Sequence, residues 1–248
     1  TGDVVVCTNE GNADMSTSMP KLHLVAMGIE KIVPDYRSLA VFQRLLCRSA
    51  TGQPTTAYTS HFRQARPGGE MHVILVDNGR SDILADPDHW ETLKCIRCGS
   101  CMNTCPVYRR SGGYSYTYFI PGPIGINLGM LRDPRRYSDN VSACTLCLSC
   151  DNVCPTHVGP GSQVYLWRQR LDSLGRANES KKLMSEGMEL LFEHPALYAS
   201  ALSLAPLANL VPGSLTHIRQ LNPWGVGHDM PHFAREPFHT LWKKGKVK

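Results

Sequence analysis

The sequence of 248 residues contains no long uninterrupted apolar run. A membrane-spanning helix needs about 18 or more apolar residues, and the most apolar stretch, residues 195–212, is interrupted by serine, proline and asparagine. Low-complexity tracts are also missing, and the apolar fraction of 42% and the charged fraction of 19% are ordinary for a globular protein. These absences predict a folded chain with no membrane span.

Signatures of several enzyme classes are absent as well. The chain has no P-loop, no G-x-G-x-x-G motif and no Ser-His-Asp order, which leaves nucleotide binding and triad hydrolysis without support. It also offers no recognisable flavin or nicotinamide site that could accept a hydride. The first residue is Thr1 and not Met, so we expect that the natural start is missing, and no signal peptide is visible.

Cysteine is abundant, and eight of the ten cysteines lie in two short runs. Residues 95–106 read CIRCGSCMNTCP and residues 144–155 read CTLCLSCDNVCP. Each run is the complete C-x2-C-x2-C-x3-C-P pattern of two-cluster ferredoxins, in which three thiolates face one cluster and the fourth reaches the other cluster. The pattern therefore predicts two [4Fe-4S] clusters, one held by Cys95, Cys98, Cys101 and Cys154 and the other by Cys144, Cys147, Cys150 and Cys105.

Zinc, disulfide bonds and purely structural clusters are the alternative explanations of the two cysteine runs. Structural zinc normally takes two separated C-x2-C pairs, and cysteines three residues apart rarely satisfy disulfide geometry. Two clusters with exchanged ligands lie close together, which suits electron transfer better than bracing of the fold. Clustered thiols favour a reducing, cytoplasmic location, and the lone Cys7 and Cys47 are expected to be buried apolar side chains.

The formal net charge of +5 counts every cysteine as neutral. Each four-iron cluster with its thiolates contributes about −2, so two clusters bring the protein close to neutrality. The lysines and arginines are scattered, with small groups at Arg132, Arg135 and Arg136 and in the tail at Lys243, Lys244, Lys246 and Lys248, which we interpret as solvated surface. No nucleic-acid partner is therefore expected.

Hydrophobic periodicity and motifs divide the chain into three predicted parts, residues 1–90, 91–160 and 161–248. The first part alternates strands and helices, an α/β pattern with an incomplete sheet, so we expect a missing segment or a partner chain to complete its core. Strands are predicted at residues 4–7, 22–26, 55–59 and 71–76, and helices at residues 36–48 and from 87 toward 95.

The second predicted part is an α-helical, ferredoxin-type cysteine domain. A segment rich in glycine, tyrosine and proline at residues 112–129 divides it, and we expect a long ordered loop there. The third part starts with a helix over residues 162–192, which Gly175 is expected to interrupt. The remaining tail, with Pro212, Pro223, Pro231 and Pro237, is predicted to be an extended arm against another surface.

Six short segments combine into a specific pattern. They are TNEGN at 8–12, GIEK at 28–31, VDNGRS at 76–81, CIRC at 95–98, PVYR at 106–109 and PGPIG at 121–125. Together they resemble the lactate utilization protein B family, the iron-sulfur subunit of a bacterial three-component L-lactate oxidation system. The resemblance implies that residues 1–90 end an α/β domain like that of the CoA-transferase and ribose-phosphate isomerase superfamily, whose first half this chain lacks.

Two turns of the first part are candidate substrate or anion loops. Glu10 and Asn12 follow one predicted strand, while Asn78 and Arg80 follow another and open a helix. Ligands bind at the carboxyl edge of α/β sheets, and an arginine at a helix start suits a small carboxylate such as lactate. Ordinary Asn-Gly turns are the competing interpretation of these residues.

The leading hypothesis is an electron-transfer subunit, without catalytic residues of its own, in a complex that oxidises L-lactate to pyruvate. Its partners would be the other subunits of that complex and a redox partner protein, through which it could also lie at a membrane surface. The alternatives are a relay in another hydroxy-acid oxidase or heterodisulfide-reductase-like complex, a catalytic subunit that binds the hydroxy acid, and an interaction module whose clusters only hold a docking surface.

Overall fold

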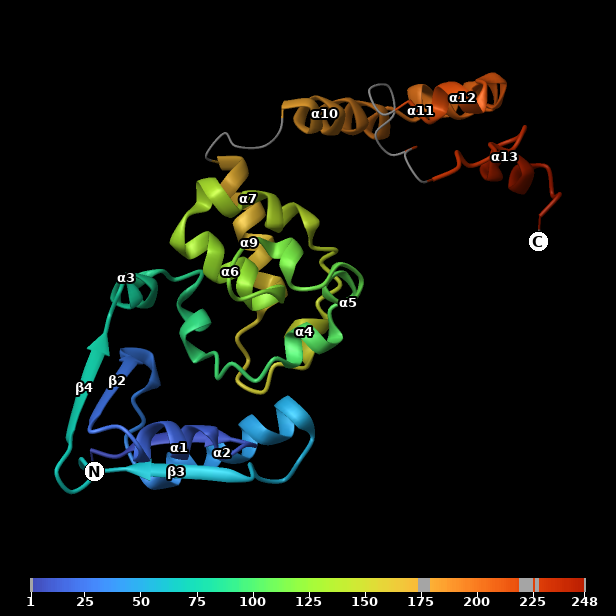
Figure 1. The fold of residues 1–248 in the computed structure, drawn as a ribbon. Coiled ribbons are helices and arrows are strands. Elements are labelled where there is room, and N and C mark those ends of the chain that lie inside the picture. Colours follow the sequence, from blue (N-terminus) through green and yellow to red (C-terminus); the bar gives the residue numbers. More distant parts are fainter. Residues whose placement is uncertain (1, 174–178, 219–224, 226–227, 248) are drawn as a thin grey trace. The chain divides into compact units, whose positions relative to one another are not determined.

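The computed structural model describes residues 2–173, 179–218, 225 and 228–247. The chain divides into two compact units, residues 1–176 and 177–248. The first unit holds an α/β region followed by a helical region, and the second unit is helical over much of its described part (Figure 1). No helix among these described residues is both long and apolar enough to cross a membrane.

The α/β region contains two small sheets of two strands each (Figure 1). Strand β1 (Val4–Thr8) pairs antiparallel with β3 (Tyr58–Phe62), and β2 (Leu22–Gly28) pairs parallel with β4 (Glu70–Val76). The helical elements are α1 (Asn12–Ser18), η1 (Ile29–Lys31), α2 (Tyr36–Thr51) and α3 (Arg80–Ala85). The parallel register sets Gly28 beside Val76, so η1 and α3 both leave the sheet at one edge.

Most predicted elements of this region are confirmed, namely the strands at 4–7, 22–26 and 71–76 and the helix at 36–48. The strand predicted at 55–59 lies instead at 58–62, because the chain turns out of α2 at Gly52 and the Asn9 side chain holds the N–H of Ala57. The helix predicted from residue 87 is only the short 3-10 helix η2 (Trp90–Lys94).

The apolar interior of the α/β region is thin. Three successive residues of β4, Val73, Ile74 and Leu75, are each about half exposed. Because neighbouring residues of a strand point to opposite faces, both faces of the β2–β4 pair lack a full cover among the described residues. That a further segment or a partner chain supplies this cover stays a prediction. Cys47 is buried as expected, whereas Cys7 is only half-buried, so that expectation was wrong for Cys7.

The helical region of the first unit is built around a single core. Besides η2, its elements are α4 (Ser100–Thr104), α5 (Pro106–Ser111), η3 (Tyr114–Tyr116), α6 (Gly122–Arg132), α7 (Pro134–Ala143), α8 (Ser149–Asn152) and α9 (Pro160–Ser173). Helix α6 packs against α7 and α9, and Met130 and Val164 are fully buried between them. The two cysteine runs come before and after α6 and α7 in the chain, and Cys144 and Leu146 of the second run pack against this core.

The predicted long loop at residues 112–129 is wrong for its second half. Helix α6 begins at Gly122 and is the central helix of the region, with Asn127 fully buried. Because it is buried on nearly every side, it has no amphipathic period that would reveal a helix. Gly125 permits a close passage of the chain, since a Cβ there would lie 1.8 Å from the carbonyl oxygen of Ile120.

The second unit has its own short elements. They are α10 (Glu179–Glu193), α11 (Pro195–Leu204), η4 (Ala205–Leu210), α12 (Gly213–Thr216) and α13 (Phe238–Lys243). The helix predicted over 162–192 is thus two helices, α9 and α10, and the predicted break at Gly175 lies outside the described residues. The described tail is extended apart from α12 and α13. The side chain of Asn209 fastens it by bonding both the C=O and the N–H of Phe233, at 2.8 and 3.0 Å.

Gly125 provides a test of the close passage in α6. We expect Gly125→Ala to destabilise the first unit by about 1–3 kcal/mol or more, because the added methyl group cannot fit against Ile120 without moving backbone. Gly187→Ala in α10 is the control, since its Cβ meets nothing within 4 Å. Chemical unfolding followed by the near-ultraviolet circular dichroism of the buried Tyr116, Tyr137 and Trp167 should show a lower midpoint only for Gly125→Ala. An unchanged midpoint would contradict the packing described for α6.

Candidate metal centres

Two cavities in the helical region are each lined by four cysteines. The first, of about 200 Å³, has Cys95, Cys98, Cys101 and Cys154 in its wall. The second is narrower, at about 20 Å³, and has Cys105, Cys144, Cys147 and Cys150 in its wall. In each cavity three sulfurs come from one cysteine run and the fourth comes from the other run. Among the described residues no three Cys, His, Asp or Glu side chains converge as the ligands of a single metal ion must.

The two cysteine runs share one backbone conformation. In the first run Arg97 and Gly99 have left-handed φ values of 62° and 82°, and in the second run Leu146 and Leu148 have values of 52° and 57° at the same two places. These residues flank the second cysteine of each run and reverse the chain twice. Such alternation turns successive N–H groups to one side, which suits a negatively charged group held there.

Backbone N–H groups reach sulfur in both runs. The N–H of Arg97 donates to the Cys95 thiol at 3.4 Å, and the N–H of Leu146 donates to the Cys144 thiol at the same distance. Donors of this kind stabilise thiolate and are among the factors that set the potential of an iron-sulfur cluster. The first cysteines of the two runs are therefore equivalent in their local geometry.

The sulfur of the fourth cysteine in each run also accepts a hydrogen bond from a backbone N–H group. Cys105 is the N-cap of α5, and its sulfur accepts the N–H of Tyr108 at 3.4 Å. Pro106 occupies the first helical position, where a missing N–H costs nothing. The sulfur of Cys154 accepts the N–H of Val158 at 3.3 Å. Both sulfurs are thus held where the chain leaves its own run.

Each run is tied to a distant segment by a cation. Lys31 Nζ donates to the carbonyl oxygen of Cys95 at 2.5 Å, and Arg168 Nη2 donates to the carbonyl oxygen of Cys144 at 2.5 Å. Lys31 belongs to η1 of the α/β region, and the Ser100 hydroxyl adds a second link by donating to the carbonyl of Ser49 at 2.5 Å. The first run is therefore positioned by the α/β region and the second run by α9.

The surroundings of the two cavities differ in charge. Asp151 follows Cys150, and its carboxylate accepts the N–H groups of Gly161 at 2.5 Å and Ser162 at 3.0 Å, so it caps the start of α9. The Cys150 thiol lies 3.5 Å from the same carboxylate. The corresponding residue of the first run is Met102, and the first run instead places Arg97 where the second has Leu146. The first site is accordingly the more positive of the two.

Burial and these charges shift the thiol pKa values. Burial raises the pKa of Cys101 to about 11, and it raises the pKa of Cys95 against the opposing effects of Arg97 and Lys31. The pKa of Cys150 is raised by burial first and by Asp151 second. Iron deprotonates its thiol ligands outright, so such buried thiols become thiolates through coordination. The four thiols at each site and their N–H donors have the chemistry that a four-iron cluster requires.

The predicted anion loops do not form a common site. Glu10 and Asn12 follow β1, and the Asn12 side chain accepts the N–H of Ala13 at 2.8 Å. Asn78 and Arg80 lie at the other sheet, along a separate cavity that neither Glu10 nor Asn12 lines. There Arg80 is paired with the Glu30 carboxylate and also donates to the carbonyl of Asp77 at 2.7 Å.

The sequence interpretation overlooked three residues that act on the cysteine runs. A comparison of the two runs would have shown Asp151, because it stands opposite Met102 in otherwise similar patterns. Nothing in the local sequence marks Lys31 or Arg168, since their partners in hydrogen bonds lie 64 and 24 residues away along the chain.

Comparisons with known proteins agree with this geometry. Residues 1–81 match the LUD domain and residues 91–158 match the 4Fe-4S dicluster domain. The chain is therefore an iron-sulfur protein with two [4Fe-4S] clusters and a mixed α/β LUD region before them. Over the part that it covers, it belongs to the lactate utilization protein B family.

The similar proteins are longer than this chain. An electron transport protein of Escherichia coli K12, described as uncharacterized and called YkgF, is 34% identical over 98% of this chain and 54% of its own length. Lactate utilization protein B of Bacillus pumilus is 36% identical over 98% and 54%, and that of Geobacillus thermodenitrificans is 39% identical over 84% and 45%. The chain thus spans about half the length of the curated relatives it matches. No solved structure matches it.

Asp151 provides a test of the charge difference between the two sites. We expect Asp151→Asn to raise the reduction potential at the second site, because the negative charge beside Cys150 opposes the added electron, while Asn still caps α9. Asp172→Asn, at the exposed far end of the same helix, is the matched control. Redox titration followed by electron paramagnetic resonance measures both sites. Equal shifts in the two variants, or none in Asp151→Asn, would show that this carboxylate does not tune the site.

Proposed function

We propose that this chain is the electron-transfer subunit of a complex that oxidises L-lactate to pyruvate. The observation that carries the proposal is the pair of four-cysteine cavities, each of which takes a sulfur from the other run. Exchange of the fourth ligand brings two clusters close together, as a path for single electrons requires. The printed names of the relatives, lactate utilization protein B and an electron transport protein, support the same direction.

The ligand sets follow from the same grouping. Cys95, Cys98, Cys101 and Cys154 would hold the first cluster, and Cys144, Cys147, Cys150 and Cys105 the second. When bound, the clusters supply one-electron redox chemistry. The protein's part is to hold the sulfurs through N–H donors, to anchor each run through Lys31 or Arg168 and to surround the sites with apolar side chains.

Charge gives the two sites unequal affinity for an electron. Lys31 and Arg97 lie near Cys95, whereas the second site has Arg168 and the opposing carboxylate of Asp151. Positive charge stabilises the reduced state and negative charge destabilises it. We therefore infer that reduction is easier at the first site, which adjoins the α/β region.

The finer fold and assembly belong to the same proposal. Residues 1–90 would be the end of a CoA-transferase-like α/β domain, residues 91–160 the ferredoxin-type domain and residues 161–248 a helical segment with an arm. The half-exposed apolar residues of β4 support a further covering surface. The remaining subunits of the complex and a redox protein are the partners that this role needs, in the cytoplasm or at a membrane surface through those partners.

The exchange of ligands can be tested by two serine variants. Purified anaerobically, the chain should contain about eight iron and eight sulfide, as two four-iron clusters require. We expect Cys154→Ser to damage the cluster of the first run and Cys105→Ser the cluster of the second, because each sulfur lines the other run's cavity. Electron paramagnetic resonance of the reduced protein distinguishes the clusters. Damage confined to each variant's own run would refute the exchange, and Cys7→Ser is the control that should leave both clusters intact.

Whether this chain oxidises L-lactate without its partner subunits can also be tested. We expect the cluster-replete chain alone not to oxidise L-lactate, because removal of a hydride equivalent needs a two-electron acceptor and each cluster takes one electron. Steady-state assay with L-lactate and an artificial electron acceptor, with and without the partner subunits, measures this. Robust turnover by the isolated chain would place the catalytic site here and support the alternative of a catalytic hydroxy-acid-binding subunit.

A further inference from the structure

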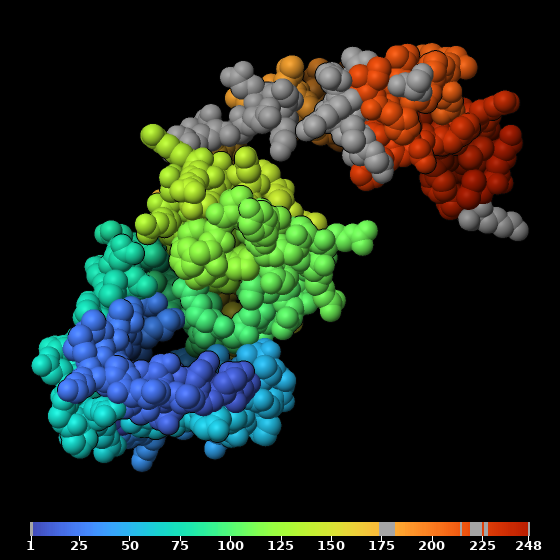
Figure 2. Space-filling view, viewed as in Figure 1, coloured from blue at the N-terminus to red at the C-terminus, as the bar shows by residue number. Residues whose placement is uncertain are grey.

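A large cavity of the first unit has none of the eight cysteines of the two runs in its wall. Its volume is about 1100 Å³, and its wall includes Lys31 and Arg80 from the α/β region and Arg97, Arg132 and Trp167 from the helical region. Figure 2 shows a hollow between these blue and green parts of the surface. Known small-molecule sites have volumes of about 300–1,000 Å³, so this space can admit an organic molecule of substantial size.

The cavity has more cations than its acidic residues neutralise. Its wall contains six cationic residues, Lys31, Arg80, Arg97, Arg132, Arg136 and Arg170, and four acidic ones, Glu30, Asp82, Asp86 and Asp133. Glu30 pairs with Lys31 and Arg80, and Asp86 pairs with Arg170 at 2.7 Å. Asp133 accepts N–H groups at the start of α7. In the described part of the chain, Arg97, Arg132 and Arg136 have no carboxylate partner within ion-pair distance, and Arg136 instead lies over the ring of Tyr137.

Arg97 and Arg132 both line the cavity, whose wall also includes Tyr118. Burial raises the pKa of the Tyr118 hydroxyl, and the charges of Arg132, Arg97 and Arg80 oppose that rise. The two guanidinium groups come from different elements, since Arg132 ends α6 and Arg97 belongs to the first cysteine run. The wall of this one cavity therefore receives positive charge from both elements.

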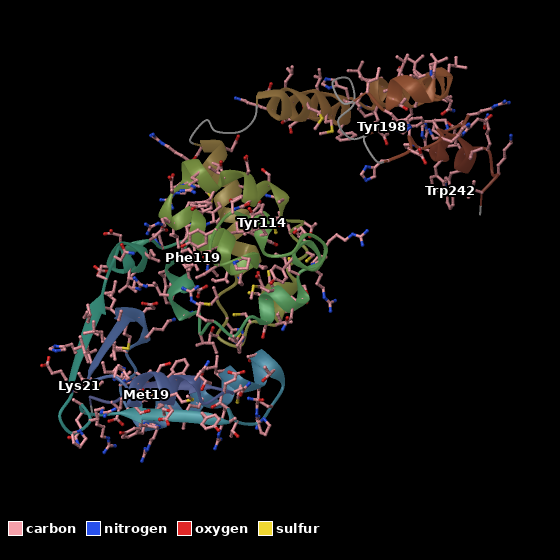
Figure 3. The ribbon with its side chains drawn as sticks, in the orientation of Figure 1. Met19, Lys21, Tyr114, Phe119, Tyr198 and Trp242 are labelled. Atoms are coloured by element: carbon pink, nitrogen blue, oxygen red, sulfur yellow. The ribbon has the colours of Figure 1, made fainter. Side chains whose placement is uncertain are left out.

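A second observation also points to a ligand. Trp167 lines the cavity at 4% exposure, and its indole N–H has no hydrogen-bond partner in the described structure. The ring is held in place by stacking on His89, with ring centres 3.9 Å apart. A buried donor without an acceptor costs about 1–3 kcal/mol, so a ligand that carries an acceptor atom would gain from bonding it. Phe119, labelled in Figure 3, adds an aromatic face that is 80% exposed.

We propose that this cavity binds an organic oxyanion, a carboxylate or phosphate compound, between Arg97 and Arg132. Arginine is well suited to both groups because its planar guanidinium can donate two parallel hydrogen bonds. Arg97 stands between two cysteines of the first run, so the ligand lies next to the first cluster site. The proposal extends the proposed function and rests on it, because a ligand beside the first cluster site matters only if that cluster transfers electrons. It also replaces Arg80, which is already ion-paired with Glu30, as the anion-binding residue.

Two kinds of compound carry this chemistry and can be told apart. A hydroxy acid or keto acid would present a carboxylate, and a nucleotide redox cofactor would present a phosphate. Equilibrium dialysis of the cluster-replete chain against L-lactate, pyruvate or flavin mononucleotide measures binding without any partner subunit or turnover. Binding of lactate or pyruvate identifies the substrate as the source, and binding of flavin mononucleotide identifies the cofactor.

Substitution of Arg132 tests the site itself. We expect Arg132→Gln to weaken binding of the selected compound about tenfold or more through loss of a charge-assisted bond, and Arg132→Lys to weaken it less. Arg135→Gln, an exposed neighbour on α7, is the matched control and should leave affinity unchanged. Ligand binding should also lower the reduction potential of the first cluster, because the anion offsets the charge of Arg97.

The results that would overturn the oxyanion site differ from those that would overturn the electron-transfer role. Absence of binding by all three compounds, or equal affinity in Arg132→Gln and the unsubstituted chain, would show that the cavity is not an oxyanion site. Iron and sulfide content and cluster spectra verify that each variant is folded, and Arg132→Lys carries the test if Arg132→Gln does not fold. If binding is lost on substitution but the complete complex does not oxidise lactate, the site stands and only the proposed function fails.

Discussion

Both four-cysteine cavities depend on one contact, the packing of the two cysteine runs against each other. Each cavity receives its fourth sulfur from the other run, so the runs must meet across the helices that separate them in sequence. Helix α6 makes that meeting possible, because Gly122, Gly125 and Gly129 let backbone and side chains approach closely on three successive turns. The core between α6, α7 and α9 is therefore the support of the redox sites as well as the source of stability.

The local equivalence of the two runs makes their few differences informative. Left-handed residues flank the second cysteine in both runs, and an N–H reaches the first sulfur in both. Against this common background, Asp151 in one run and Arg97 in the other stand out as charged replacements of apolar residues. A relay needs both sites to exchange electrons but gains direction when their potentials differ. A difference of charge on a shared backbone would give the proposed relay such a difference without a change of ligands.

The α/β region contributes to the first site through contacts as well as through its position in the chain. Lys31 bonds the carbonyl of Cys95, and the carbonyl of Ser49 receives the hydroxyl of Ser100. The same edge of the β2–β4 sheet supplies Glu30 and Arg80 to the large cavity. A ligand bound there would contact the α/β region and the first cysteine run together, which is a physical basis for coupling an organic reaction to a single-electron path.

The sequence alone determined the number and kind of clusters and the α/β character of the first part of the chain, because ligand spacing and strand periodicity are local properties of the chain. It did not reveal α6, since a helix buried on nearly every side has no amphipathic period. Tertiary structure alone decided that Glu30, 50 residues away, pairs with Arg80 and that Arg97 and Arg132 share a cavity. Charges act through space, so their pairing depends on which segments folding brings together.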